Sequence, residues 1–421
     1  MSLNISKSLV LQSGNTGYVY ATDEWIWVTD QSWAWNLEKG EYMEQTRLLG
    51  FRLEGATSTF GVIGSVPGSL LSQFSIDFVT DKDKDKEYIR IATTQNLFQR
   101  GWWGAPVPVV MPDIFMVDEE EEVEDEGVEE VAEEPSTFEA KEDPMDESRT
   151  KNEIIILEIP NVENSNELIK LGSVRLGKKD ETITAVRFFD NISYVVTFER
   201  TDPFYVLELS DPMDPKVLGE LEIPGFSEFM HPIKEDNSML ITVGKAADEN
   251  GRVLGLQISL FDSTVPTDPQ LIDRLVIEDD KDSSSGSSAS WDERAFRYIQ
   301  VGDIGRLIIP VSIYSYGSNF LENENFEGFM VFGVDLTKTE NMITQEIKID
   351  HSHNEEEVEE DYYTTNYSSC YCGYTWLPER SMVFDGNLMT LKNQEVMSTN
   401  LVTHESQWNL TLKDDDNCCN P

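Results

Sequence analysis

Residues Glu181–Val243 read ETITAVRFFDNISYVVTFERTDPFYVLELSDPMDPKVLGELEIPGFSEFMHPIKEDNSMLITV. The stretch holds five short runs of β-branched and aromatic residues, and Asp-Pro dipeptides begin at Asp202, Asp211 and Asp214. Proline fixes φ and cannot donate to a β-ladder, and the side chain of the preceding aspartate can close an Asx-turn. Short runs bounded in this way predict strands joined by hairpins.

A diverged copy of the middle of this stretch recurs along the chain. Each copy is an apolar run that ends in an acidic residue and a turn, and these acidic residues are Glu54, Glu158, Glu208, Asp262 and Asp335. Their successive gaps are 104, 50, 54 and 73 residues, and an insertion over residues 100–150 explains the long first gap. One four-stranded propeller blade repeats at about this period. The sequence therefore predicts an all-β fold, a β-propeller of about five to six four-stranded blades that could belong to a larger ring.

The whole chain, residues 1–421, is predicted to form one propeller domain. Within the 100–150 insertion, Asp118–Thr150 holds 17 acidic residues against Lys141 and Arg149. Such a composition cannot offset the entropy of ordering, so we expect a disordered connection between two strands. The Ser-rich stretch Glu278–Glu293 is also predicted to be a flexible loop, and residues 351–421 a diverged C-terminal blade region with clustered cysteines.

Ring closure is expected to involve both ends of the chain. The strands over Tyr18–Asp30 are predicted to belong to a blade whose remainder is missing or donated by the C-terminus. The late strands Ser381–Gly386 and Asn387–Lys392 are the expected closing partners. A closed ring removes the exposed sheet edges that would otherwise promote aggregation.

The composition limits the choice of partners. The chain has 79 acidic and 32 basic residues, a formal net charge of −47. It should repel nucleic acid and anionic membranes, and cations or basic proteins suit it better; an acidic surface that only maintains solubility is the favoured interpretation. No apolar run is long enough for a transmembrane segment, and the first residues lack the apolar core of a signal peptide.

Four stretches carry a resemblance to a known family: Ser65–Asp77, Tyr88–Thr94, Ile183–Pro232 and Ile258–Pro269. They resemble the secreted bacterial and archaeal proteins with a C-terminal β-propeller domain distantly related to WD40 repeats. The resemblance implies an extracellular or cell-surface propeller, and it attaches no activity to the family as a whole. Family members carry more propeller sequence upstream, which leaves the blade count open. In a weaker match that begins at Trp291, the family pattern has a histidine at the position of Glu293.

Four cysteines lie near the C-terminus: Cys370, Cys372, Cys418 and Cys419. Disulfides between the two pairs would suit an oxidising compartment, with three connectivities open. Unpaired thiols are an alternative. A zinc site that joins His351 and His353 to Cys370 and Cys372 has suitable ligand chemistry, but its spacing matches no standard finger.

Other side chains offer weaker signals. His231 is the only histidine inside the repeat motif, and a structural histidine that bonds neighbouring backbone is favoured over a general base. The adjacent Trp102 and Trp103 could form a stacking platform for sugar or peptide, or pack at a blade junction. The segment Asp81–Glu87 is predicted to be an exposed hairpin turn and not a calcium loop. Glycosylation sequons occur at Asn4, Asn191, Asn366 and Asn409, of which Asn191 falls in a predicted hairpin turn.

Three functional hypotheses follow. The first is a non-enzymatic extracellular propeller that binds protein or polysaccharide through loops on one face. The second is a hydrolase or lyase with carboxylates at the central mouth of the ring, although no catalytic motif is present. The third is a calcium-dependent adhesion or structural protein, and calcium is the only cofactor that the composition suggests.

Overall fold

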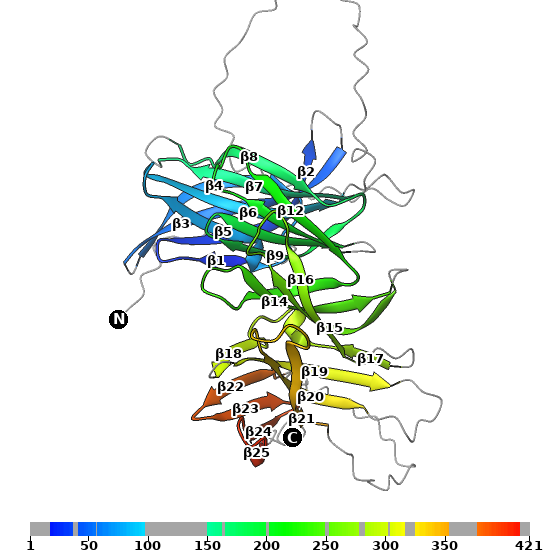
Figure 1. The fold of residues 1–421 in the computed structure, drawn as a ribbon. Helices are drawn as coiled ribbons and strands as arrows, with labels where there is room; N and C mark the ends of the chain where they lie inside the picture. Colours follow the sequence, from blue (N-terminus) through cyan, green and yellow to red (C-terminus); the bar gives the residue numbers. More distant parts are fainter. Residues whose placement is uncertain are drawn as a thin grey trace, which may run out of the picture.

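The computed structural model describes residues 17–36, 41–55, 57–96, 150–161, 165–198, 202–248, 252–277, 283–301, 304–315, 325–352 and 377–412. In these residues the chain forms six antiparallel sheets that follow one another in chain order, named here blades 1 to 6. Figure 1 shows the succession from the blue strands of blade 1 to the orange strands of blade 6. The prediction of an all-β propeller with about five to six four-stranded blades is confirmed.

The first three blades have four strands each. Blade 1 consists of β1 (Val19–Ala21), β2 (Trp25–Asn36), β3 (Glu41–Glu54) and β4 (Thr57–Pro67). Blade 2 consists of β5 (Ile76–Asp81), β6 (Lys86–Asn96), β7 (Thr150–Ile159) and β8 (Ile169–Leu176). Blade 3 consists of β9 (Thr182–Phe189), β10 (Ile192–Phe198), β11 (Asp202–Glu208) and β12 (Lys216–Ile223).

The last three blades repeat the arrangement with one addition. Blade 4 consists of β13 (Phe226–Pro232), β14 (Met239–Ala247), β15 (Val253–Asp262) and β16 (Gln270–Ile277). Blade 5 has two short inner strands, β17 (Ser283–Gly286) and β18 (Arg297–Val301), beside β19 (Ile304–Ser315), β20 (Phe326–Val334) and β21 (Ile343–Asp350). Blade 6 consists of β22 (Arg380–Phe384), β23 (Asn387–Lys392), β24 (Glu395–Asn400) and β25 (Ser406–Thr411).

The recurring runs of the sequence occupy the third strand of the first five blades, β3, β7, β11, β15 and β20. The acidic residue that ends a run has a local structural role. The Oδ1 atom of Asp262 accepts from the backbone N–H of Thr264 at 2.8 Å, and Oδ1 of Asp335 accepts from that of Thr337 at 3.0 Å. These Asx-turns lead the chain into the fourth strand and explain why the acid and the turn recur together.

Apolar packing between neighbouring blades forms the core. Five buried clusters each join two consecutive blades. In β7, for example, Ile155 and Leu157 pack towards blade 1, whereas Ile154 and Ile156 pack towards blade 3. Successive side chains of a strand point to opposite faces, so a central strand buried on both faces reads as an unbroken apolar run.

Two predictions about the chain ends and loops are wrong. Blade 1 has four strands from its own residues, and β22 and β23 pair with each other and, through β23, with β24, not with the N-terminal strands. The stretch Glu278–Glu293 contains strand β17 and a 3-10 turn, η3 (Ser288–Ser290), where the sequence suggests only a loop. The side chain of Ser285 explains why this stretch is structured, because its Oγ accepts from Leu256 N–H and donates to the Ile277 carbonyl.

In the part of the chain that the structure describes, no helix is long and apolar enough to cross a membrane. The insertion predicted over residues 100–150 lies almost entirely outside that part, and so does most of the cysteine-bearing region 351–421. The strands that flank the insertion are paired in register, with Asn96 of β6 opposite Thr150 of β7.

Candidate functional site

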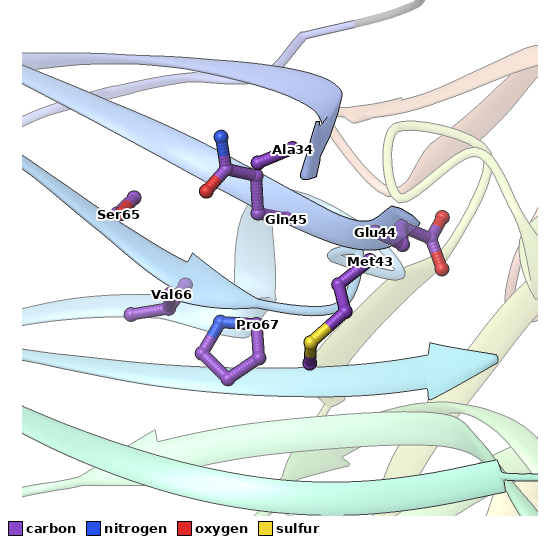
Figure 2. Close-up of a pocket in the computed structure, with 7 residues that line it drawn as sticks. All are labelled: Ala34, Met43, Glu44, Gln45, Ser65, Val66 and Pro67. Carbon is purple, nitrogen blue, oxygen red and sulfur yellow. The ribbon is translucent and has the colours of Figure 1, made fainter. Parts of the chain in front are cut away.

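A shallow pocket of about 250 Å³ lies where the β2–β3 hairpin extends beyond the rest of blade 1. Figure 2 shows its lining residues, Ala34, Met43, Glu44, Gln45, Ser65, Val66 and Pro67. The hairpin is long, since β2 and β3 pair from Trp25 opposite Arg52 to Asn36 opposite Glu41. Strand β1 spans only three residues, so the end of β2 has no inner strand beside it in the described chain. Strand β4 ends at Pro67, opposite Gln45, so the pocket lies where β2 and β3 continue past the end of β4.

The pocket has an apolar floor and a polar rim. In Figure 2 the thioether of Met43 and the ring of Pro67 lie on one side, and the carboxylate of Glu44 points away from them. Glu44 is only 4% exposed, and it accepts from the side-chain amide of Gln31 and from Nδ2 of Asn96, the latter at 3.4 Å. Because Asn96 ends β6, these bonds hold the hairpin against blade 2. The Glu44 carboxylate therefore helps to position the β2–β3 hairpin, which forms one wall of the pocket.

An ion pair separates this pocket from the other end of blade 1. Nε of Arg47 donates to Oδ2 of Asp30 at 2.9 Å, and its Nη2 contacts the same oxygen. The two residues face each other on β3 and β2, and the Asp30 side chain is almost fully buried. The ion pair marks the end of the polar part of this face of blade 1, and the rest of the face is apolar.

A second group of charged and aromatic side chains meets near the inner strands. The guanidinium carbon of Arg187, on β9, lies 3.2 Å from the ring centroid of Phe74 and 4.6 Å from that of Phe229. Its Nε donates to the Met230 carbonyl at 2.9 Å. Burial lowers the pKa of Arg187 to about 9, an effect that the nearby carboxylate of Glu293 opposes. Arg187 thus remains a cation at neutral pH and contacts two aromatic faces.

The same region ties distant parts of the array together. Phe74 belongs to a short 3-10 turn, η1 (Gln73–Ser75), in the connection between blades 1 and 2. Nε2 of Gln73 donates to Oε1 of Glu293 in blade 5 at 2.7 Å. Glu293 is the position at which this chain departs from the histidine of the resembling family. In this chain the Glu293 carboxylate accepts the hydrogen bond that links blade 5 to the connection between blades 1 and 2.

His231 lies in this group and packs through its ring. The ring centroid is 5.1 Å from that of Phe296 and 5.9 Å from that of Tyr298. Burial, with a smaller contribution from the positive charge of Arg187, lowers the pKa of His231 to about 4. The imidazole is therefore neutral at pH 7. The contacts of its ring are aromatic, where a bond to neighbouring backbone was expected, and a structural role stays a prediction.

Two further buried groups with perturbed pKa values, Asp77 and Lys245, lie in separate blades. Burial raises the pKa of Asp77 in blade 2, although Arg90 donates to this carboxylate through Nε at 2.7 Å. Burial lowers the pKa of Lys245 in blade 4, and its Nζ donates to the Ser285 carbonyl at 2.6 Å. Each group is held by a partner that belongs to the fold. This pattern is typical of structural pairs and not of an acid and a base poised around one substrate.

The structure describes His351, the first residue of the zinc hypothesis. Its Nε2 lies 2.9 Å from the Thr390 hydroxyl, and its Nδ1 lies 3.7 Å from Oε2 of Glu395. Burial lowers the pKa of this histidine. The ring thus connects blade 5 to blade 6. Among the described residues, no group of three or more His, Cys, Asp or Glu could hold a metal ion.

Most of the other predicted site residues lie outside the described residues: Trp102, Trp103, His353, Asn366, Cys370, Cys372, Cys418 and Cys419. Asn191 is exposed in the turn between β9 and β10, where the sequence places it, and its glycosylation remains a prediction. The segment Asp81–Glu87 forms the expected hairpin turn, with Oδ1 of Asp81 accepting from the N–H groups of Asp83 and Lys84.

Sequence reasoning missed the two places described above. Arg187 could have been noticed as a lone cation inside the apolar run of β9. The pocket has no comparable signal, because its lining residues are common types. It lies where β4 ends beside the longer β2–β3 hairpin, which depends on the strand register.

The chain belongs to the β-propeller domain family, whose match covers residues 2–404. It is similar to an uncharacterised protein of Archaeoglobus fulgidus, at 29% identity over 237 residues, which are 56% of this chain and 26% of the relative. An uncharacterised protein of Methanocaldococcus jannaschii is 41% identical over 109 residues, which are 26% of this chain and 16% of the relative. The matched parts therefore span well under two thirds of these relatives.

Solved structures resemble the fold only distantly. Sqt1 of Saccharomyces cerevisiae has a TM-score of 0.40 at 8% identity, over 92% of this chain and 83% of that one. Apo AztD of Citrobacter koseri has a TM-score of 0.30 at 10% identity, over 94% of this chain and 86% of that one. Neither comparison bears on function.

Proposed function

We propose that this chain is a non-enzymatic binding module that holds a protein ligand at the pocket end of blade 1. One observation carries the proposal: the cation near the inner strands, Arg187, lies against the rings of Phe74 and Phe229, an arrangement typical of structural packing and not of catalysis. Two buried groups with shifted pKa values, Asp77 and Lys245, are held by structural partners in separate blades. Outer surfaces and loops remain as the means of recognition, and propellers commonly carry function there.

An extracellular or cell-surface location belongs to the same proposal. It rests on the resemblance to secreted propellers with distant WD40 relationship, and on the net charge of −47. A strongly acidic surface keeps a protein dispersed in saline surroundings and attracts basic partners. A protein ligand is preferred to a polysaccharide because the pocket floor is apolar, with Met43, Val66 and Pro67.

A peptide selection tests the proposal. Peptides from a random phage library are selected on the immobilised full chain, and their affinities are measured by fluorescence anisotropy. Ser65→Trp fills the pocket from an exposed position, and we expect it to weaken binding by about tenfold or more. Ser58→Trp is the matched control, since this exposed serine lies on the same strand, seven residues from Ser65.

The other outcomes contradict the proposal in distinct ways. Selected peptides that bind wild type and Ser65→Trp equally would place recognition elsewhere. Retardation in gels that contain a soluble polysaccharide, lost in Ser65→Trp, would favour a carbohydrate ligand. Release of new reducing or unsaturated ends from such polymers by the purified chain would establish the hydrolase or lyase alternative.

A further inference from the structure

Three exposed apolar side chains gather at the outer rim of the junction between blades 2 and 3. They are Ile169 of β8, Met213 in the turn between β11 and β12, and Val217 of β12, named here the rim group, and their exposed fractions are 48%, 71% and 39%. Ile169 pairs with Glu158 near the end of β7, whereas the pocket of blade 1 is bonded to Asn96, which lies opposite the first residue of β7. The rim group and the pocket therefore lie at opposite ends of the strands.

The strand register turns two members of the rim group towards the same junction. On β7, Ile156 packs towards blade 3, and Glu158 and its partner Ile169 lie on the same face. On β12, Val217 lies opposite Leu207, which packs towards blade 2. Ile169 and Val217 therefore border this junction from its two sides.

The turn between β11 and β12 holds the third member, Met213, in place. Oδ1 of Asp211 accepts from the Met213 N–H at 3.0 Å, and the Asp211 carbonyl accepts from the Asp214 N–H at 3.1 Å. The Met213 backbone also lies against β8, since a Cβ at Gly172 would come within 2.9 Å of the Met213 carbonyl oxygen. The most exposed member is thus an adaptable thioether side chain on an ordered backbone, a combination that suits recognition.

The next junction shows that the fold does not require apolar side chains at this rim. Between blades 3 and 4 the turn from β15 to β16 lies against Gly219 in the same way. The register places Lys216 of β12 where β8 has Ile169. The two turns have equal length, and Thr267 stands where the turn of blade 3 has Met213. The same backbone is therefore compatible with a polar rim, and the rim group is particular to one junction.

Carboxylates surround the rim group. Asp211 accepts from a backbone N–H of its own turn, so its charge is not neutralised by that bond. Glu220 lies on the face of β12 that Val217 shares. Nζ of Lys178 is 4.0 Å from Oε1 of Glu220 but also contacts Glu222, so one lysine is shared by two carboxylates. The local charge is therefore negative.

Two lysines that flank the rim group are already paired. Nζ of Lys216 lies 2.9 Å from Oδ2 of Asp214, and Nζ of Lys86 lies 2.7 Å from Oε2 of Glu158. An approaching molecule thus meets apolar side chains within a negative surround. Lys or Arg beside apolar side chains would complement both features.

We propose that the rim group is a second binding surface, which holds a protein segment that presents apolar side chains beside Lys or Arg. The proposal goes beyond the pocket of blade 1 and does not depend on it. Burial of Met213 supplies the apolar contact, and the carboxylates select basic residues. A second copy of this chain fits less well, because its net charge of −47 adds repulsion. Closure of the ring would leave the rim group as it is, since blades 2 and 3 already pack on each other.

A peptide selection on a chain whose pocket is filled tests the proposal. Random phage-displayed peptides are selected on immobilised Ser65→Trp at about 0.15 M NaCl, which weakens non-specific attraction to the acidic surface. Affinities are then measured by fluorescence anisotropy for further variants of that chain. Met213→Thr and Ile169→Lys copy the residues of the next junction and should each weaken binding by about tenfold or more. Asp211→Asn keeps the acceptor of the turn but removes its charge, and it should weaken binding by about threefold. Val265→Thr is the matched control, because Val265 is exposed in the equivalent turn of blade 4.

Each outcome decides for or against the rim group. Selected peptides with Lys or Arg beside apolar residues, weakened by Met213→Thr and Ile169→Lys but not by Val265→Thr, would support it. No selected peptides, or peptides that bind all the variants equally, would overturn it. Self-association of wild type in sedimentation velocity, abolished by Met213→Thr, would assign the surface to a second copy instead. Melting curves equal to that of the parent chain would show that the variants are folded. The pocket proposal is judged separately, by peptides that bind wild type but not Ser65→Trp.

Discussion

At the scale of single residues, burial near the inner strands lowers the pKa values of ionisable side chains. His231 and Arg187 are both ionisable, yet aromatic rings surround them and carboxylates are few among their close neighbours. Desolvation lowers both pKa values, but the two residues end in different states. The arginine remains charged at pH 7 and the histidine is neutral. Both therefore act as packing elements of the propeller centre.

His231 should make folding sensitive to mild acid. The folded-state pKa of about 4 lies below the ordinary value of 6.5, so the unfolded chain binds one more proton between these pH values. The contribution of His231 is fully present above about pH 6.5 and is lost as the pH falls towards 4. In urea unfolding at several pH values, wild type should lose stability relative to His231→Phe as the solution is acidified. Parallel pH profiles would contradict this prediction.

At the scale of elements, the connections between blades depend on glycine. Gly68 and Gly225 follow the fourth strands of blades 1 and 3, and their φ angles are +86° and +97°. A Cβ at Gly225 would lie 2.4 Å from the Lys245 carbonyl oxygen, which belongs to the next blade. The chain can cross closely from one blade to the next only because no side chain is present there.

Gly225→Ala should therefore destabilise the protein by about 2–4 kcal/mol, through both backbone strain and the clash. Gly386→Ala is a suitable control, because Gly386 has a φ of +74° but no neighbouring atom within 4 Å. Backbone strain alone should cost about 1 kcal/mol there. Equal losses in the two variants, measured by urea unfolding, would show that the crossing is not sterically constrained.

The hairpin of β6 and β7 should tolerate loss of the segment between its strands. Asn96 and Thr150 pair directly, so an Asn-Gly turn can replace residues 97–149. A shorter connection has a lower entropic cost of loop closure. The deletion also removes the 17 acidic residues that begin at Asp118. The melting temperature in calorimetry should stay the same or rise. A lost cooperative transition would mean that this segment supports the fold.

At the scale of the whole molecule, charge opposes compactness. The net charge of −47 places many carboxylates near one another on the folded surface. Self-repulsion of this kind destabilises a compact state and is screened by salt. The fold is maintained by the apolar junctions between its blades, which salt does not weaken.

The melting temperature should therefore rise when NaCl increases from 0.05 M to 1 M. Calcium at matched ionic strength should be compared with chelator, so that an effect specific to the ion is separated from screening. A rise specific to calcium would support the adhesion hypothesis through mass action. It would direct attention to the acidic segment outside the described blades.

The propeller could be predicted from sequence because its signals are local. Apolar runs, an acid such as Asp262 and the turn after it recur blade by blade, and each carries its own physical reason. The partner of Glu293 could not be predicted, since Gln73 lies 220 residues away. The pocket was equally hidden, because it depends on where β4 ends beside the longer hairpin of β2 and β3.

The sequence alone determined the strands, the turns, the blade period and the acidic surface, since all of these follow from residues near one another in the chain. Only the tertiary structure decided that blade 1 is completed by its own strands and that Arg187 and His231 meet at the centre. These features depend on which faces of distant strands are brought together, and such long-range packing leaves no periodic pattern in the sequence.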